Sequence, residues 1–311
     1  MKKNIKLYLL SGFLGSGKTT FLTNLLNDLS NEKIGVIMNE FGKIGIDGPI
    51  IKKQGMELVE INRGSIFCSC LKLSFVSAMA EMADKDLNYL FVESSGLADP
   101  SNIGDVLYGV KQTEGDVYDY KGAICIVDAL NFLQQVQELE TVERQIKFCH
   151  LVVINKTDLV SEEILNEIKE KIRQINDKVE IKEASFGKFE YDFLYKDIIK
   201  NQEIEGEDTT NTPNSKPKTL TLTYNGQVNK EELNKFLEIV SKDTYRMKGF
   251  LYLDNGWNQV DVVNSKIDYK KCEDKKEDSK LVIISKIGPK VIKPIIDTWN
   301  EIVKNDMKLR N

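Results

Sequence analysis

The feature that most constrains this chain is a glycine-rich segment near its start. An apolar run at 5–11 leads into GFLGSGKT at 12–19, which fits the pattern G-x-x-x-x-G-K-[ST], and a helical pattern follows at 19–30. Glycine lets the backbone of such a loop wrap around phosphate oxygens, with its amides and the N-terminus of the next helix facing the negative charge. A strand before the motif and a helix after it are the context in which it binds nucleotides. The sequence therefore predicts a phosphate-binding loop in an α/β domain.

Each position of this loop has an expected task. Lys18 is expected to reach the β- and γ-phosphates and so take part in catalysis, and the Thr19 hydroxyl is expected to ligate Mg²⁺. The other residues of the loop are expected to contact the phosphates through amides or hydroxyls; they are Gly12, Gly15, Ser16, Gly17 and Thr20.

A second motif indicates which base the nucleotide carries. Asn155-Lys156-Thr157-Asp158 follows an apolar run at 150–154. Asp158 can accept two hydrogen bonds from N1–H and the exocyclic amine of guanine, Lys156 can lie across the ring, and Asn155 can brace the loops. Ser185 ends another apolar run and is a candidate for presenting a backbone amide to the guanine carbonyl. Together with the phosphate loop, this motif predicts GTP as the ligand.

Two further strand ends carry candidate residues for the γ-phosphate and for Mg²⁺. Glu93 is expected to hold Mg²⁺ or position the attacking water, and the Gly96 amide to contact the γ-phosphate, so that the loop senses hydrolysis. Segment 39–47 is a candidate first switch, in which Asp47 is a further Mg²⁺ ligand and Glu40 a metal-binding carboxylate. The alternative for both segments is a strand-ending turn without function.

Apolar runs and helical patterns alternate along the first 200 residues. The runs lie at 5–11, 34–39, 88–94, 121–127, 150–155 and 179–185, and the helical patterns at 19–30, 72–84, 129–148 and 161–175. This alternation predicts an α/β fold with a mostly parallel sheet, so we expect residues 1–200 to form a P-loop GTPase domain.

The pattern changes near residue 200. The polar segment 201–217 is expected to be a linker, and 218–311 to form a smaller α+β domain with an antiparallel sheet. The expected strands there are 218–224, 248–254, 257–263 and 281–286, the expected helices are 230–241 and about 291–304, and 270–280 is expected to be a charged turn.

Composition excludes several classes of protein. Lys and Arg number 43 against 48 Asp and Glu, a net charge of −5 that argues against a general nucleic-acid partner. No apolar run approaches the roughly 20 residues of a membrane helix. The single His150 excludes a histidine-rich metal site, and five cysteines do not make a disulfide framework, so we expect a cytoplasmic protein. His150, Cys125 and Cys149 are expected to be structural.

Taken together, these motifs resemble those of the CobW family of GTPases, relatives of the UreG and HypB metallochaperones. The resemblance is carried by GFLGSGKTT at 12–20, NEFGKIGID at 39–47, ELVEI at 57–61, ESSGLADP at 93–100, VDA at 127–129, NKTDL at 155–159 and KGFLYL at 248–253. It implies a CobW C-terminal-like second domain and slow, Mg²⁺-dependent hydrolysis of GTP to GDP and phosphate. It also implies coupling of the nucleotide state to metal delivery or to the maturation of metalloenzymes or cobalamin enzymes. The implied partner is a client metalloenzyme or corrinoid protein, and a homodimer is an open alternative.

The chain departs from this family at its cysteines. Where members usually carry Cys-x-Cys-Cys, this chain has Ser65 and Phe67 at the first two cysteine positions, Cys68 at the third, and an additional Cys70. Thiolates at i and i+2 before a helix can share a soft ion such as Zn²⁺ or Co²⁺, with Glu40 or a second subunit completing the ligands. A redox-sensitive thiol pair and two packed side chains are the alternatives.

Three rival functions fit parts of this pattern. The first is an activator GTPase of corrinoid-dependent methyltransferases, which the altered cysteines favour. The second is a GTP-gated interaction protein without metal cargo. The third is a P-loop kinase, against which the Asn-Lys-x-Asp motif argues.

Overall fold

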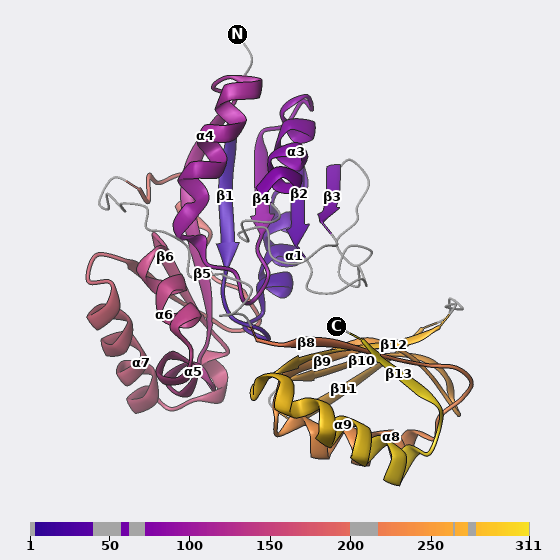
Figure 1. The fold of residues 1–311 in the computed structure, drawn as a ribbon. Coiled ribbons are helices and arrows are strands. Elements are labelled where there is room, and N and C mark those ends of the chain that lie inside the picture. Colours follow the sequence, from indigo (N-terminus) through magenta and orange to yellow (C-terminus); the bar gives the residue numbers. More distant parts are fainter. Residues whose placement is uncertain are drawn as a thin grey trace. The chain divides into compact units, whose positions relative to one another are not determined.

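The computed structural model describes residues 4–39, 57–61, 72–199, 217–263, 265–272 and 278–310. The chain divides into two compact units, Met1–Ser215 and Lys216–Asn311. The predicted fold class is confirmed, since the first unit is an α/β fold around a parallel sheet and the second contains an antiparallel sheet with helices (Figure 1).

The first unit is built on seven parallel strands in the order β3-β2-β4-β1-β5-β6-β7. The strands are β1 (Ile5–Ser11), β2 (Ile34–Asn39), β3 (Glu57–Ile61), β4 (Tyr89–Glu93), β5 (Tyr118–Asp128), β6 (Leu151–Asn155) and β7 (Glu180–Ala184). Every residue of β4 and β6 is buried. This burial agrees with their continuous apolar sequences, because strands of a parallel sheet are covered by helices on both faces.

Helices cover both faces of this sheet. They are α1 (Lys18–Asp28), α3 (Lys72–Ala83), α4 (Ile103–Glu114), α5 (Phe132–Glu138), α6 (Glu140–Lys147) and α7 (Glu162–Ile175), with short 3₁₀ turns η1 (Pro100–Asn102), η2 (Thr157–Leu159) and η3 (Asp192–Leu194). Helices α3 and α4 lie side by side on one face (Figure 1). On α1, Phe21 is fully buried and packs against the rings of Phe189 and Phe193.

The strand register gathers the candidate residues at one edge of the sheet. Leu10 pairs with Glu93, Asp128 pairs with Asn155, and Asn155 pairs with Ala184. Because all seven strands run in the same direction, their carboxyl ends meet at this edge, which is where ligands bind in open α/β sheets.

Two helical expectations for this unit were incomplete. The single helix expected at 129–148 is two helices, α5 and α6, separated at Leu139, whose backbone is extended (φ −132°, ψ 105°). Helix α4 was not expected, because only Val106 and Val110 of its residues are buried and the apolar pattern is weak.

The second unit is a six-stranded antiparallel sheet in the order β11-β10-β9-β12-β8-β13. Its strands are β8 (Thr219–Tyr224), β9 (Thr244–Leu253), β10 (Gly256–Val263), β11 (Lys266–Lys271), β12 (Ser279–Ser285) and β13 (Met307–Arg310). Its helical segments are α8 (Lys230–Ser241), η4 (Gly288–Val291), α9 (Ile292–Thr298) and the π-helical turn η5 (Trp299–Val303).

Helices α8 and α9 lie on the same face of this sheet (Figure 1). Helix α8 begins where the Asn229 side chain accepts hydrogen bonds from the amides of Glu231 and Glu232, a usual N-cap. The core beneath the helices is centred on Trp299, which is fully buried and meets the ring of Phe236 edge-on. No helix within the described ranges of either unit has the length and apolar character needed to cross a membrane.

Candidate functional site

The phosphate loop joins β1 to α1 and encloses the Lys18 ammonium. Lys18 Nζ donates to the carbonyl oxygens of Gly12 (2.8 Å) and Phe13 (3.3 Å), and the residue is 9% exposed. The Ser16 amide also donates to the Phe13 carbonyl, which tightens the turn. The loop thus holds a cation beside the N-terminus of α1, the combination that attracts phosphate. Thr20 lies two positions after Lys18 on α1 and is exposed.

Asn155 connects this loop to two others. Its Nδ2 donates to the Ser16 carbonyl (2.9 Å), and its Oδ1 accepts from the amide of Gly187, in the loop after β7 (2.9 Å). Gly17 approaches Asn155 so closely that an added Cβ would lie 2.3 Å from Nδ2, and its φ of 101° also favours glycine. The structure therefore brings the phosphate loop and the Asn-Lys-x-Asp loop together through a buried amide.

Lys156 makes a second bridge between the same loops. Its Nζ donates to the Gly15 carbonyl (2.8 Å) and to Asp128 Oδ2 (2.8 Å) at the end of β5. The Asp128 side chain is 1% exposed and also accepts from Asn131 Nδ2 and the Leu130 amide. The sequence motifs assign no role to Asp128, which lies within the VDA segment at 127–129. The signal that points to it is an acidic residue at the end of an apolar strand beside the phosphate loop.

The other residues expected to contact the base lie near Asn155 and Lys156. Thr157 Oγ1 is 3.2 Å from both the Ala184 carbonyl oxygen and Ser185 Oγ, so the ends of β6 and β7 are joined. Asp158 lies on the turn η2 and is exposed. The carboxylate expected to read the base is therefore accessible to a ligand.

The hydroxyl of the residue after Lys18 contacts a carboxylate at the end of β4. Thr19 Oγ1 donates to Glu93 Oε1 at 3.2 Å, and Glu93 is only 7% exposed. Oxygen ligands of this kind suit a small hard cation, so the residues present fit Mg²⁺. The other expected metal ligands, Asp47 and Glu40, lie outside the described residues.

The loop after β4 is wedged against the phosphate loop. An added Cβ at Gly96 would lie 2.5 Å from the Leu14 side chain and 2.7 Å from the Leu14 amide nitrogen, so glycine is required by this close approach. Ser94 donates from both its amide and its hydroxyl to the Leu10 carbonyl, which fixes the start of the loop at the end of β1. The predicted γ-phosphate sensor therefore lies directly beside the phosphate loop.

The predicted transition-metal ligands Cys68 and Cys70 also lie outside the described residues. Cys125 and Cys149 are buried, as predicted, and burial raises the pKa of the Cys149 thiol. His150 is buried too: its Nδ1 accepts from the Ala123 amide (3.1 Å), and burial lowers its pKa to about 4. Among the residues that the structure describes, no group of three or more His, Cys, Asp or Glu is placed to hold a metal ion.

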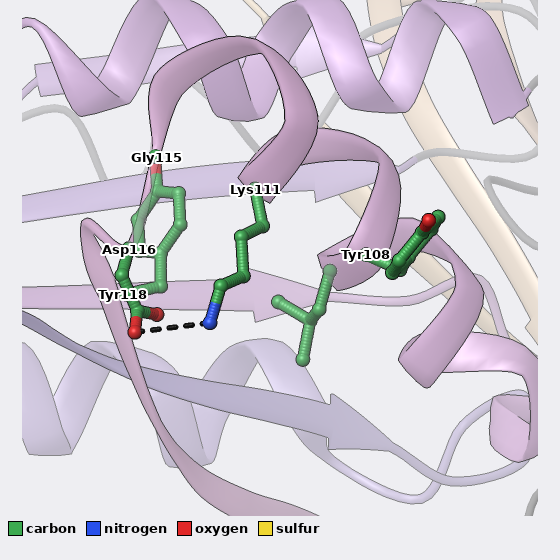
Figure 2. A pocket seen from close by; sticks show the side chains of 6 residues that line it. Tyr108, Lys111, Gly115, Asp116 and Tyr118 are labelled. Atoms are coloured by element: carbon green, nitrogen blue, oxygen red, sulfur yellow. Dashed lines mark hydrogen bonds and ion pairs between the residues drawn. The ribbon is translucent and has the colours of Figure 1, made fainter.

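A small pocket lies at the opposite edge of the sheet, between the end of α4 and the start of β5 (Figure 2). Its lining residues are Leu107, Tyr108, Lys111, Gly115, Asp116 and Tyr118. Lys111 and Asp116 form an exposed ion pair of 3.0 Å in it (Figure 2). Because Tyr118 begins β5, this pocket is separate from the edge that carries the phosphate loop.

Comparison with known proteins gives matches across both units. Zinc chaperone YjiA of Escherichia coli is 27% identical over 197 residues, which are 61% of this chain and 61% of that protein. Zinc-regulated GTPase metalloprotein activator 1 of Dictyostelium discoideum is 31% identical over 203 residues, 54% of this chain and 43% of that protein. The chain therefore matches less than two thirds of the length of each of these relatives.

The crystal structure of the Zn(II)-bound YjiA GTPase from E. coli gives a TM-score of 0.48 at 20% identity, over 96% of this chain and 99% of that one. Two family models match the sequence itself. Residues 6–183 match the CobW/HypB/UreG nucleotide-binding domain, and residues 218–294 match the cobalamin synthesis protein cobW C-terminal domain. The phosphate loop, the Thr19–Glu93 contact and the Asn-Lys-x-Asp loop lie at one edge of the parallel sheet. With this site and the match over residues 6–183, the chain belongs to the CobW/HypB/UreG family.

Proposed function

We propose that this chain is a Mg²⁺-dependent GTPase that couples its nucleotide state to the delivery of a metal ion to a client protein. The observation that carries the proposal is the 3.2 Å contact between Thr19 and Glu93 beside the loop that encloses Lys18. Thr19 supplies a hydroxyl, Glu93 a carboxylate and Lys18 an ammonium, which are the groups that bind a nucleoside triphosphate and its cation. Family membership supports the metal-related role, since two relatives are named a zinc chaperone and a zinc-regulated GTPase.

The chain's own groups divide the work of hydrolysis. Lys18 exchanges its bonds to the Gly12 and Phe13 carbonyls for the β- and γ-phosphate oxygens, and the loop amides bind the remaining oxygens. Thr19 and Glu93 would hold Mg²⁺, and the ion would supply positive charge against the charge that develops on the phosphates. Glu93 also orients the attacking water, and the Gly96 amide contacts the γ-phosphate. No arginine finger is assigned, so we expect slow intrinsic hydrolysis that a partner accelerates.

Guanine recognition rests on the exposed Asp158, with Lys156 and Ser185 beside it. Asp158→Ala is expected to remove the preference for GTP over ATP, because the carboxylate no longer accepts from the guanine N1–H and amine. Competition of each nucleotide against a fluorescent GDP measures this preference, and Glu162→Ala, an exposed acid at the start of α7, is the control. Equal affinities of the unmodified protein for GTP and ATP would defeat the guanine assignment.

The metal cargo is assigned to Cys68 and Cys70, with Glu40 as a third ligand from the first switch. A ligand in that switch would make metal affinity depend on the γ-phosphate. Anaerobic titration with Zn²⁺ and Co²⁺, with and without a non-hydrolysable GTP analogue, tests this coupling. Cys68→Ser/Cys70→Ser is expected to abolish tight binding, whereas Cys272→Ser in the second unit is expected to leave it unchanged. Metal affinity that is the same in both nucleotide states would remove the coupled site.

The altered cysteine pattern favours a second candidate function. With Ser65 and Phe67 at two of the family's cysteine positions, this segment has two thiols, Cys68 and Cys70, and two thiolates do not complete a tetrahedral zinc site. The candidate is a GTPase that activates a corrinoid-dependent enzyme, or gates a protein partner, without carrying metal. It predicts that Cys68→Ser/Cys70→Ser retains GTP-dependent binding to the partner, which a pull-down with the client metalloenzyme or corrinoid protein would measure. A homodimer bridged by metal would instead require both thiols.

A further inference from the structure

Two consecutive side chains of α6 reach the loop that follows β4. Arg144 Nε donates to Asp99 Oδ2 at 2.8 Å, and the two side chains are only 10% and 1% exposed. Gln145 Nε2 donates to the carbonyl oxygens of Gly96 (3.2 Å) and Ala98 (2.9 Å), and Gln145 is 1% exposed. The loop is therefore bonded to α6 by a buried ion pair and by two buried backbone contacts.

The opposite side of the same loop packs on the phosphate loop. There is no space for a Cβ at Gly96, because Leu14 lies 2.5 Å from where it would be. The loop thus lies between the phosphate loop and α6. Gly96 contacts Leu14 of the phosphate loop, and its carbonyl accepts from Gln145 of α6, so both neighbours help to set the position of its amide.

The contacts from α6 are directional as well as buried. The Arg144 guanidinium also lies over the Phe148 ring, 4.9 Å from its centroid, which fixes its plane. Asp99 uses its other oxygen, Oδ1, to accept from the Ser101 amide at 3.0 Å, so the start of η1 is held at the same point. Losing these hydrogen bonds would cost free energy, because water cannot replace the donors of a buried carboxylate and buried carbonyls.

We propose that Arg144 and Gln145 are positioning residues for γ-phosphate recognition: they hold residues 96–99 where the Gly96 amide meets the γ-phosphate of GTP. The inference rests on the proposed GTPase function. It makes α6 the element that distinguishes GTP from GDP indirectly, without touching the nucleotide. A loop released from α6 would lose its contact with the γ-phosphate and no other contact with the nucleotide. Because GDP has no γ-phosphate, GDP binding would be unaffected.

The test measures the affinities for fluorescent GDP and for a fluorescent, non-hydrolysable GTP analogue. Gln145→Met keeps the side-chain length and removes the donor, and it is expected to weaken binding of the GTP analogue about tenfold while leaving GDP affinity unchanged. Arg144→Met is expected to act in the same direction, and Arg144→Lys, which keeps the charge, to recover part of the loss. Glu143→Ala, exposed on the same helix, is the matched control.

A second variant guards against misfolding, because Arg144→Met removes the ion pair of the buried Asp99 carboxylate. Arg144→Met/Asp99→Asn removes that charge and is expected to show the same selective loss. If the variants lower both affinities by the same factor, or lower neither, the positioning role is refuted. If the unmodified protein does not bind the GTP analogue, the proposed function itself fails, which is a distinguishable result.

Discussion

Replacing Asp128 by Asn isolates the electrostatic support of the Asn-Lys-x-Asp loop. Asp128 accepts from Lys156 Nζ (2.8 Å), Asn131 Nδ2 (2.9 Å) and the Leu130 amide (3.1 Å), and its side chain is 1% exposed. Asn keeps the shape but has one acceptor oxygen, so its NH₂ group must face at least one of these donors. The charge that binds Lys156 is lost as well.

The structure limits the size of the effect. Breaking a fully buried ion pair costs about 3–5 kcal/mol, but a charge-assisted hydrogen bond whose partner can be rehydrated costs about 1.5–3 kcal/mol. The Lys156 side chain is 29% exposed, so water can reach its ammonium. We therefore expect Asp128→Asn to lower the free energy of unfolding by about 2–3 kcal/mol. GTP and GDP affinity should both fall about tenfold, because Lys156 also supports the Gly15 carbonyl of the phosphate loop.

Urea unfolding followed by far-UV circular dichroism measures the first effect, and calorimetric titration with GDP measures the second. A loss of 2–3 kcal/mol should move the midpoint by about 1 M for a unit of this size. Glu183→Gln is the control: its pair with Lys169 is exposed (47% and 32%), so the expected loss is below about 1 kcal/mol. If Asp128→Asn has the same urea midpoint as the control and binds GDP with normal affinity, Asp128 does not support Lys156 as inferred.

Three further predictions test other parts of the molecule. Burial lowers the pKa of His150 from 6.5 to about 4, so the unfolded chain takes up the proton at a higher pH than the folded chain. The full stability is therefore present above about pH 6.5 and falls progressively as the pH drops towards 4. The expected loss between pH 7.5 and 5 is on the order of 2 kcal/mol in urea unfolding, and His150→Asn should abolish it; an unchanged slope would contradict the assignment. Gly17→Ala should abolish nucleotide binding, since its Cβ would lie 2.3 Å from Asn155 Nδ2, and normal GDP binding in a titration would show that the loop adjusts. Phe236→Ala should destabilise the second unit by about 3–5 kcal/mol. It should also shift the emission of the buried Trp299 to longer wavelength, and unaltered fluorescence would argue against their ring contact.

Elements that contain a buried, locally readable pattern were predictable. Strand β1, α1 and the phosphate loop between them follow from adjacent residues, because an apolar run, spaced glycines and a helical period all act over a few positions. Strands β11 and β13, at the edges of the sheet of the second unit, were not expected, for the opposite reason. Strands β11 and β13 contain no buried residue, so their sequences do not differ from those of polar loops. The break at Leu139 was missed because it lies inside a continuous helical pattern.

The candidate site divides in the same way. Lys18, Thr19 and Asn155 could be named as candidates from the sequence, because each belongs to a short motif with a recognisable spacing. Arg144 was not, because its partner Asp99 is 45 residues away in sequence, and nothing near Arg144 distinguishes it from a surface arginine. Asp128 and Lys156 are 28 residues apart and meet only because β5 and β6 pair in parallel with Asp128 opposite Asn155.

By itself, therefore, the sequence determined the nucleotide-binding motifs, the parallel α/β class and the family resemblance, because these depend on local residue type and spacing. Tertiary structure alone decided which strand ends lie side by side, which carboxylate holds Lys156, and that α6 supports the loop containing Gly96. The physical reason is that hydrogen bonds and ion pairs form over about 3 Å in space whatever the separation along the chain, so only the packed strands and helices select their partners.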